Sequence, residues 1–173
     1  MNQNHNEYAR IMGVSPSSKG FGFAILEGRQ KLVSWDNKSA KGDRKNAQCL
    51  KHLKKLLDIY KPEVLVLEDC SAKSCLRRKR TRILIQAMAD LGPAYGMSIA
   101  LVSKEQVKQS LLTDGKGTQY DIAVDLAKRF PEELAHDLPP KRKIYEAENS
   151  KMDIFDAMAL VLASIEAFAE PTS

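Results

Sequence analysis

Long hydrophobic runs are missing from this sequence of 173 residues. No apolar stretch approaches the roughly 20 residues that a membrane-spanning helix needs, so we expect no contact with a membrane. The first residues, MNQNHNE, are polar and lack the apolar segment of a secretory signal peptide. The sequence therefore predicts a soluble cytoplasmic protein, with a disordered tail over residues 1–7 and a single domain over residues 8–170.

Cysteine and aromatic residues are also scarce. The three cysteines, Cys49, Cys70 and Cys75, form no C-x-x-C pair and are odd in number, which favours reduced thiols over a disulfide framework. Cys49 and His52 form a C-x-x-H pair, but nothing elsewhere completes a tetrahedral zinc site. Aromatic residues are few near the basic ones, so we expect contacts to a nucleic-acid backbone rather than stacking on unpaired bases.

Positive charge is present in moderate excess, and it is concentrated. The formal net charge is +5 at pH 7. The segment KSCLRRKRTR contains no acid and six cations, namely Lys73, Arg77, Arg78, Lys79, Arg80 and Arg82. Most of these fall near the expected start of a helix, where the macrodipole disfavours positive charge, so a phosphate backbone outside the helix would stabilise them. We therefore predict that this run binds nucleic acid; a solvated charged face is the alternative.

Apolar periodicity along the chain predicts an α/β protein. Residues 8–36 read as three antiparallel strands, with a hairpin turn at residues 27–30. A helix over residues 43–60 and the unbroken apolar run VLVL follow, and such a run is typical of a strand covered on both faces. A helix over 74–95 and a strand over 99–102 complete the order βββαβαβ, which indicates a mixed sheet with parallel members. Further helices are expected over residues 103–112, 118–130 and 150–168, with an exposed connection over 131–149.

Acidic side chains occur where they are costly to bury. Glu68 and Asp69 end the most apolar strand, and ligands of open α/β sheets bind at the carboxyl ends of strands. Asp156 lies in a helix that is apolar on nearly every side, Asp153 is on the same face, and Glu148 lies just before the helix. Carboxylates that meet at one sheet edge form an oxygen-rich site that suits Mg²⁺. Two such ions can clamp the oxygens of a phosphodiester during hydrolysis.

Each of these acids also has a structural interpretation. Asp153 is placed to cap its helix together with Ser150, and Glu68 or Asp69 would mark the exit of the strand into solvent. Asp156 would form a structural ion pair. No cation follows it in its helix, so its partner has to come from elsewhere in the chain.

Four segments resemble, in order, the motifs of the RuvC family of Holliday-junction endonucleases, within the RNase H-like superfamily. They are IMGVSPSSKGFGFAIL, VLVLED, VSKEQVKQSLL and MDIFDAMALVLA, and they span about residues 9–167. The resemblance implies an RNase H-like fold with a mixed five-stranded sheet, flanking helices and a C-terminal helix. It also implies Mg²⁺ or Mn²⁺ as cofactor, DNA rather than RNA as partner, and commonly a homodimer.

The same resemblance implies roles for individual residues. Glu68, Asp153 and Asp156 fall at acidic positions that hold metal and serve catalysis, and Lys108 falls at a phosphate-contacting position. Ser15 stands where the family has its first aspartate. It would be a weak fourth ligand, because a neutral hydroxyl binds a hard cation less well than a carboxylate does.

Other positions depart from the family pattern. Ser17 replaces the glycine that follows the proline, and Cys70-Ser71-Ala72 stands where the family carries an aromatic wedge against junction bases. Gln119 falls where a second family lysine would align, and Lys116 lies close by as a further candidate for DNA contact.

Three functions remain open from the sequence. The first is a metal-dependent endonuclease acting on branched or structured DNA, in which Asp69 or Glu148 replaces the carboxylate missing at Ser15. The second is a nucleic-acid-binding protein of the same fold whose catalysis is impaired by that serine. The third is an actin-like nucleotide-binding module, indicated only by Gly20 and Gly22, and such proteins normally need two domains around the nucleotide.

Overall fold

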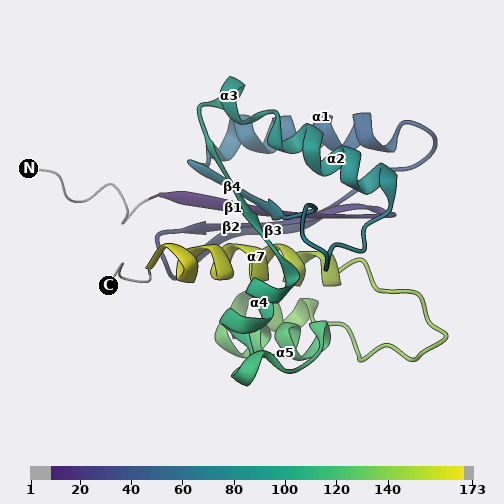
Figure 1. Ribbon diagram of the computed structural model, residues 1–173, viewed down its shortest axis with the longest axis vertical. Helices are drawn as coiled ribbons and strands as arrows, with labels where there is room; N and C mark the ends of the chain where they lie inside the picture. The colour runs from purple at the N-terminus through teal and green to yellow at the C-terminus, as the bar shows by residue number, and fades with distance from the viewer. Residues whose placement is uncertain (1–8, 170–173) are drawn as a thin grey trace, which may run out of the picture.

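A five-stranded mixed sheet forms the centre of the molecule (Figure 1). The computed structural model describes residues 9–169, so the tail predicted at residues 1–7 lies outside the described residues. The strands are β1 (Arg10–Ser17), β2 (Gly20–Glu27), β3 (Lys31–Ser39), β4 (Val64–Glu68) and β5 (Ser98–Val102), in the spatial order β3-β2-β1-β4-β5. The first three strands are antiparallel, whereas β4 and β5 run parallel to β1. The predicted order βββαβαβ is confirmed.

Helices cover both faces of this sheet (Figure 1). On one face lie α1 (Lys45–Tyr60), α2 (Lys79–Ala89) and α3 (Gly92–Tyr95). On the other lies α7 (Met152–Ala169), with α4 (Lys104–Leu111) and α5 (Gln119–Arg129) packed beyond it. Two short helical turns, η1 (Thr113–Gly115) and η2 (Ala135–Asp137), and the short helix α6 (Pro131–Leu134) join these elements. Within residues 9–169, no helix is both long and apolar enough to span a membrane.

The apolar run of β4 is explained by this two-sided cover. Leu65 and Leu67 pack into the cluster beneath α1 and α2, whereas Val66 packs with Leu160 and Ala163 of α7. All three β4 side chains are fully buried. An alternating pattern would have left a polar side chain in one of these two cores.

Two glycines allow α7 to lie directly against the sheet. A Cβ atom at Gly13 would collide with the main chain of Ala157, and one at Gly22 would collide with the main chain of Asp153. Gly22 also pairs with Ser15 in the β1–β2 ladder. This close approach places the first two turns of α7 beside the end of β1. Gly22, one of the two glycines that indicated an actin-like module, therefore has a packing role.

The region after β4 differs from its prediction. A continuous helix was expected over residues 74–95, but residues 69–78 form an irregular loop and the helical part is divided into α2 and α3. Side-chain bonds hold the loop: Arg82 donates to the carbonyls of Cys75 and Arg77, at 2.7 and 2.9 Å. Tertiary contacts of this kind outweigh local helix propensity. Lys73, Arg77 and Arg78 consequently precede the helix rather than belonging to it.

The helices differ in how they begin. At α4, Ser103 and Gln106 form a capping box with both of its hydrogen bonds. In contrast, α1 begins at Lys45 with no side-chain cap. At α7, the main-chain N–H of Asp153 bonds to the carbonyl of Ser150, so the aspartate side chain is left for other contacts.

Candidate functional site

A cavity of about 290 Å³ opens at the carboxyl ends of β1 and β4, beside the start of α7. This is the edge at which ligands of α/β sheets bind. Its polar lining consists of Ser15, Ser17, Glu68, Arg77, Lys104, Lys108, Gln119, Glu148, Asp153 and Asp156. The residues come from β1, from β4 and the loop after it, from α4 and α5, and from α7 and the connection before it.

The predicted acids meet in this cavity. Glu68 ends β4, and Asp153 and Asp156 extend from the first two turns of α7. Glu68 and Asp153 are buried. Glu148 also lines the cavity, whereas Asp69 turns to its own loop and accepts hydrogen bonds from Ser71 at 2.6 and 3.0 Å. Of the two suggested replacements for the missing carboxylate, only Glu148 lines the cavity.

Arg77 from the basic run points into the cavity. Its Nε lies 3.2 Å from Oε2 of Glu68. Its two terminal nitrogens donate to the carbonyl of Pro16 at 2.9 Å and to Oγ of Ser15 at 3.3 Å. The Arg77 side chain is 22% exposed and that of Glu68 only 7%. A guanidinium cation therefore bridges the ends of β1 and β4, next to the serine that stands for the family aspartate.

The two aspartates of α7 have raised pKa values. Burial raises the pKa of Asp156 to about 7, although a hydrogen bond from Gln119 and the charge of Arg77 act in the opposite direction. Nε2 of Gln119 lies 2.6 and 2.5 Å from the two carboxylate oxygens of Asp156. Burial likewise raises the pKa of Asp153 to about 6, against hydrogen bonding to Ser17 and the charge of Arg77. The cavity thus carries less negative charge at neutral pH than its three predicted acids imply.

Asp156→Asn is expected to stabilise the fold at about pH 8 and to have little effect at about pH 4. The folded-state pKa of Asp156, about 7, lies above the roughly 3.9 of an unfolded chain. The wild-type protein therefore has its full stability below pH 4, where the carboxyl is protonated in both states. It loses stability as the pH rises through 7, because the buried carboxyl has to ionise. Asparagine does not ionise. Allowing for partial contact with solvent, we expect a gain of about 2 kcal/mol in the free energy of unfolding. Urea denaturation at both pH values measures the free energy of unfolding. If the variant changed this free energy equally at both pH values, ionisation of Asp156 would not be the cause.

Comparison with known proteins identifies the fold. No family model and no curated protein matches the sequence. Among solved structures, RuvC of Thermus thermophilus matches with a TM-score of 0.66 and 14% identity, over 92% of this chain and 95% of its own. The chain has the RuvC fold. This confirms the RNase H-like architecture expected from the four sequence motifs.

Two further resolvases share this RuvC fold at similarly low identity. The yeast mitochondrial Holliday junction resolvase matches with a TM-score of 0.59 and 12% identity, over 93% of this chain and 79% of its own. The fowlpox virus resolvase matches with a TM-score of 0.57 and 15% identity, over 93% of this chain and 99% of its own. All three are resolvases, and the likeness extends over nearly the whole chain.

The side chains of the acidic cavity, as they are arranged in this structure, do not fit Mg²⁺ or Mn²⁺. In proteins, hard divalent ions are held by oxygen ligands that converge on one point and include at least one or two free carboxylates. Here Ser15 offers a hydroxyl, Oε2 of Glu68 is paired with Arg77, and Asp156 is held by Gln119 with a raised pKa. Among the described residues, the ligand oxygens of Glu68, Asp153 and Asp156 do not all lie within 4.8 Å of one another. The metal role of these residues stays a prediction.

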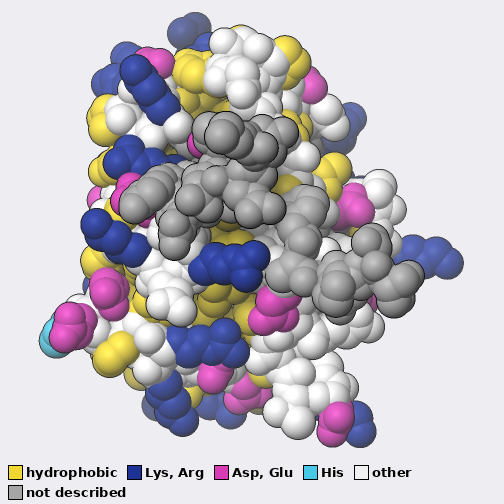
Figure 2. Space-filling model, turned by 90° about the vertical axis from the view of Figure 1, so that its left-hand side faces the viewer, with side chains coloured by type: hydrophobic (Ala, Val, Ile, Leu, Met, Phe, Trp, Pro, Cys, Tyr) yellow, Lys and Arg dark blue, Asp and Glu magenta, His cyan; other side chains and the backbone are white. Residues whose placement is uncertain are grey.

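The other predicted DNA-binding residues divide into two groups. Arg80 is half-buried and donates to Asn46 at 2.7 Å and to the carbonyl of Ser17 at 3.0 Å, so it supports the cavity from inside. The remaining cations are exposed to solvent near the carboxyl edge of the RuvC-fold sheet: Lys73, Arg78, Lys79, Arg82 and Lys116. Lys108, with Lys104, lines the cavity itself from α4. The face of the molecule at the other end of the sheet shows cationic, acidic and hydrophobic side chains interspersed (Figure 2).

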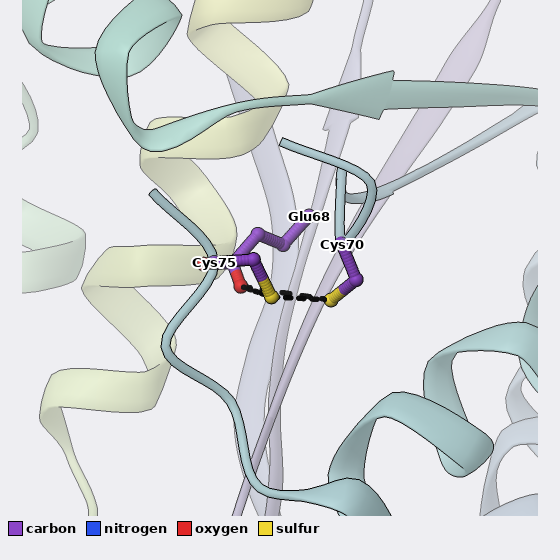
Figure 3. Close-up of side chains that lie close together, drawn as sticks. All are labelled: Glu68, Cys70 and Cys75. Carbon is purple, nitrogen blue, oxygen red and sulfur yellow. Dashed lines mark hydrogen bonds between the residues drawn. The ribbon is translucent and has the colours of Figure 1, made fainter. Parts of the chain in front are cut away.

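Sequence reasoning missed two features of the site. The first is that the side chain of Arg77 points into the cavity, whereas the basic run as a whole was predicted to contact nucleic acid. The second is the cluster of Cys70, Cys75 and Glu68 beside the cavity (Figure 3). Burial and its neighbours raise the pKa of Cys70 to about 12, so that thiol is protonated at neutral pH. A C-x-x-x-x-C spacing directly after an acidic strand end was the available signal.

Proposed function

We propose that this chain binds branched DNA at the carboxyl edge of its sheet and does not hydrolyse it. Binding is supported by the fold, because Thermus thermophilus RuvC and the fowlpox virus resolvase have been solved in complex with Holliday junction DNA. It is also supported by the exposed cations around the cavity, which are suited to contact a phosphate backbone. The proposal includes the predicted single domain over residues 8–170 and the predicted cytoplasmic location.

The ion pair of Arg77 with Glu68 is the observation that carries the proposal. A guanidinium that contacts Glu68, Ser15 and the Pro16 carbonyl supplies positive charge where a nuclease of this type needs divalent ions. Removing Arg77 from this position would leave Glu68 buried without its partner, which costs about 3 kcal/mol or more. The arrangement therefore opposes entry of Mg²⁺ or Mn²⁺ into the acidic cavity, and Ser15 offers no carboxylate to favour it.

The exposed cations would contact the DNA. Arg78, Lys79 and Arg82 lie at the start of α2, Lys73 in the preceding loop, and Lys116 before α5. Their ammonium and guanidinium groups have solvent on one side, so phosphate oxygens can replace water without breaking protein contacts. Lys108 would meet a phosphate that enters the cavity. Arg77 and Arg80 would instead hold the DNA-facing loop in place.

Metal-dependent cleavage is the second candidate, and one observation favours it. Glu68, Asp153, Asp156 and Lys108 all line one cavity, as the resemblance to the RuvC family implies. For cleavage, the side chain of Arg77 would have to leave the cavity when DNA binds. A homodimer, which the same resemblance implies, would present two such cavities to a junction.

Binding and cleavage can be tested on one set of substrates. A labelled four-way junction and a linear duplex of the same sequence are titrated with protein, with and without Mg²⁺ or Mn²⁺. We expect tighter binding to the junction, a logarithmic loss of affinity with salt, and no product in either metal. Nicking of the junction in Mn²⁺ would establish the second candidate instead, and equal affinity for the duplex would contradict branched-DNA selectivity.

A further inference from the structure

Three potential ligand atoms gather at the end of β4, on the loop side of Glu68 (Figure 3). Sγ of Cys75 lies 3.3 Å from Oε2 of Glu68, and Sγ of Cys70 lies 3.8 Å from the same oxygen. The two sulfur atoms are 2.8 Å apart. Cys75 and Glu68 are buried, whereas Cys70 is partly open to solvent. The cluster is therefore shielded but can be reached from outside.

We propose that Cys70, Cys75 and Glu68 form a binding site for a thiophilic divalent ion of the Zn²⁺ class. Both cysteines would release their thiol protons when the ion binds. The two thiolates and the carboxylate would then supply three ligands, and water would take the fourth position of a tetrahedron. Thiolate ligands select Zn²⁺ over Mg²⁺ or Mn²⁺, which prefer oxygen. This site is thus chemically distinct from the hard-metal site expected of the acidic cavity, and it does not depend on the proposed DNA binding.

Two of the three spacings between the ligand atoms are close to those of such an ion. With metal–sulfur bonds of about 2.3 Å and a metal–oxygen bond of about 2.0–2.2 Å, the edges of a tetrahedron are roughly 3.5–3.8 Å. The two sulfur–oxygen distances of 3.3 and 3.8 Å lie near this range. The sulfur–sulfur distance would have to widen by about 1 Å. Cys70 lies in the irregular loop, where a side-chain rotation can supply that movement.

Neighbouring arginines complete the site. The two thiolates and Glu68 carry three negative charges, which the divalent ion and the guanidinium of Arg77 together balance. Nε of Arg77 holds the ligating carboxylate at 3.2 Å, as hydrogen-bond donors commonly do around metal ligands. Arg82 donates to the carbonyl of Cys75 at 2.7 Å and fixes the loop that carries the sulfur. The ion would therefore fasten the loop from which Lys73 and Arg78 face solvent.

Metal content and Co²⁺ spectra test the proposal directly. Protein purified under reducing conditions is stripped of metal, reloaded with one equivalent of Zn²⁺, and measured by native mass spectrometry. We expect one ion per chain in the wild type and at least about a tenfold weaker Zn²⁺ affinity in Cys70→Ser and Cys75→Ser. Co²⁺ should give thiolate charge-transfer absorption in the wild type only. Cys49→Ala is the matched control, because Cys49 is a buried residue of α1 outside the cluster, and its loss should leave both signals unchanged.

Several results would overturn the zinc site. One is a reduced wild type that retains no Zn²⁺ and shows no Co²⁺ band. Another is a Cys70–Cys75 disulfide, lighter by two hydrogens, in the reduced preparation together with no metal. Equal Zn²⁺ binding by Cys70→Ser would assign the metal to other residues. Asp156→Asn, which changes the acidic cavity alone, should leave Zn²⁺ content intact. Zn²⁺ content is measured without DNA, so failure of the DNA-binding proposal and failure of this one can be told apart.

Discussion

Replacing Ser15 with Asp and Arg77 with Gln in one chain is expected to produce a protein that binds Mn²⁺ and cleaves a four-way junction. The double change adds the missing carboxylate and removes the guanidinium that contacts both Ser15 and Glu68. Without metal, the extra negative charge should destabilise the fold. At a Mn²⁺ concentration of about 100 times its dissociation constant, binding should return about 2.7 kcal/mol, visible as a rise in Tm. The double variant should give nicked product in Mn²⁺, whereas the wild type should give none.

Ser15→Asp alone is the informative control for this experiment. Arg77 remains in place, and its terminal nitrogen, 3.3 Å from the serine oxygen, would pair with the new carboxylate. We therefore expect no Mn²⁺-dependent rise in Tm and no gain in cleavage. A wild-type protein that cuts as fast as the double variant would contradict the inhibitory role of Arg77, as would a wild type stabilised by Mn²⁺.

The double change Arg78→Ala with Lys79→Ala is expected to weaken junction binding by about 10- to 100-fold at low salt. Both side chains are exposed at the carboxyl edge of the sheet, and each would neutralise a phosphate when DNA binds. The slope of log K against log salt should fall by about 2, since about one counterion is released per contact. Fluorescence anisotropy over a salt series measures both quantities.

Arg29 and Lys31 provide a matched pair for this comparison. They lie in and after the β2–β3 turn, which is at the opposite end of the sheet because Glu27 pairs with Arg10 at the start of β1. Both are exposed, and changing both to Ala removes the same charge. Affinity and salt slope should match the wild type. Equal losses in the two double variants would show that only net charge matters and that no DNA-binding edge exists.

Much of the acidic cavity was predictable because its parts are encoded locally. The unbroken apolar run that ends at Glu68 indicates a doubly covered strand, and ligand sites lie at the ends of such strands. An aspartate such as Asp156, in a helix otherwise apolar on nearly all sides, indicates a buried carboxyl. A partner from outside the helix was also expected, but as a cation in an ion pair. The neutral amide of Gln119 in α5 donates to Asp156 instead.

The sequence by itself determined the order of strands and helices and the edge at which the acids meet, because apolar periodicity and strand ends act over a few neighbouring residues. Only the tertiary structure decided the direction of Arg77, the pairing of Cys70 with Cys75, and the choice of Glu148 over Asp69 as a lining residue. These depend on the path of the loop over residues 69–78, of which residues 74–78 were predicted as helix. That path is set by hydrogen bonds such as the one from Arg77 to Ser15, which are 62 positions apart. A local sequence pattern cannot predict such a bond.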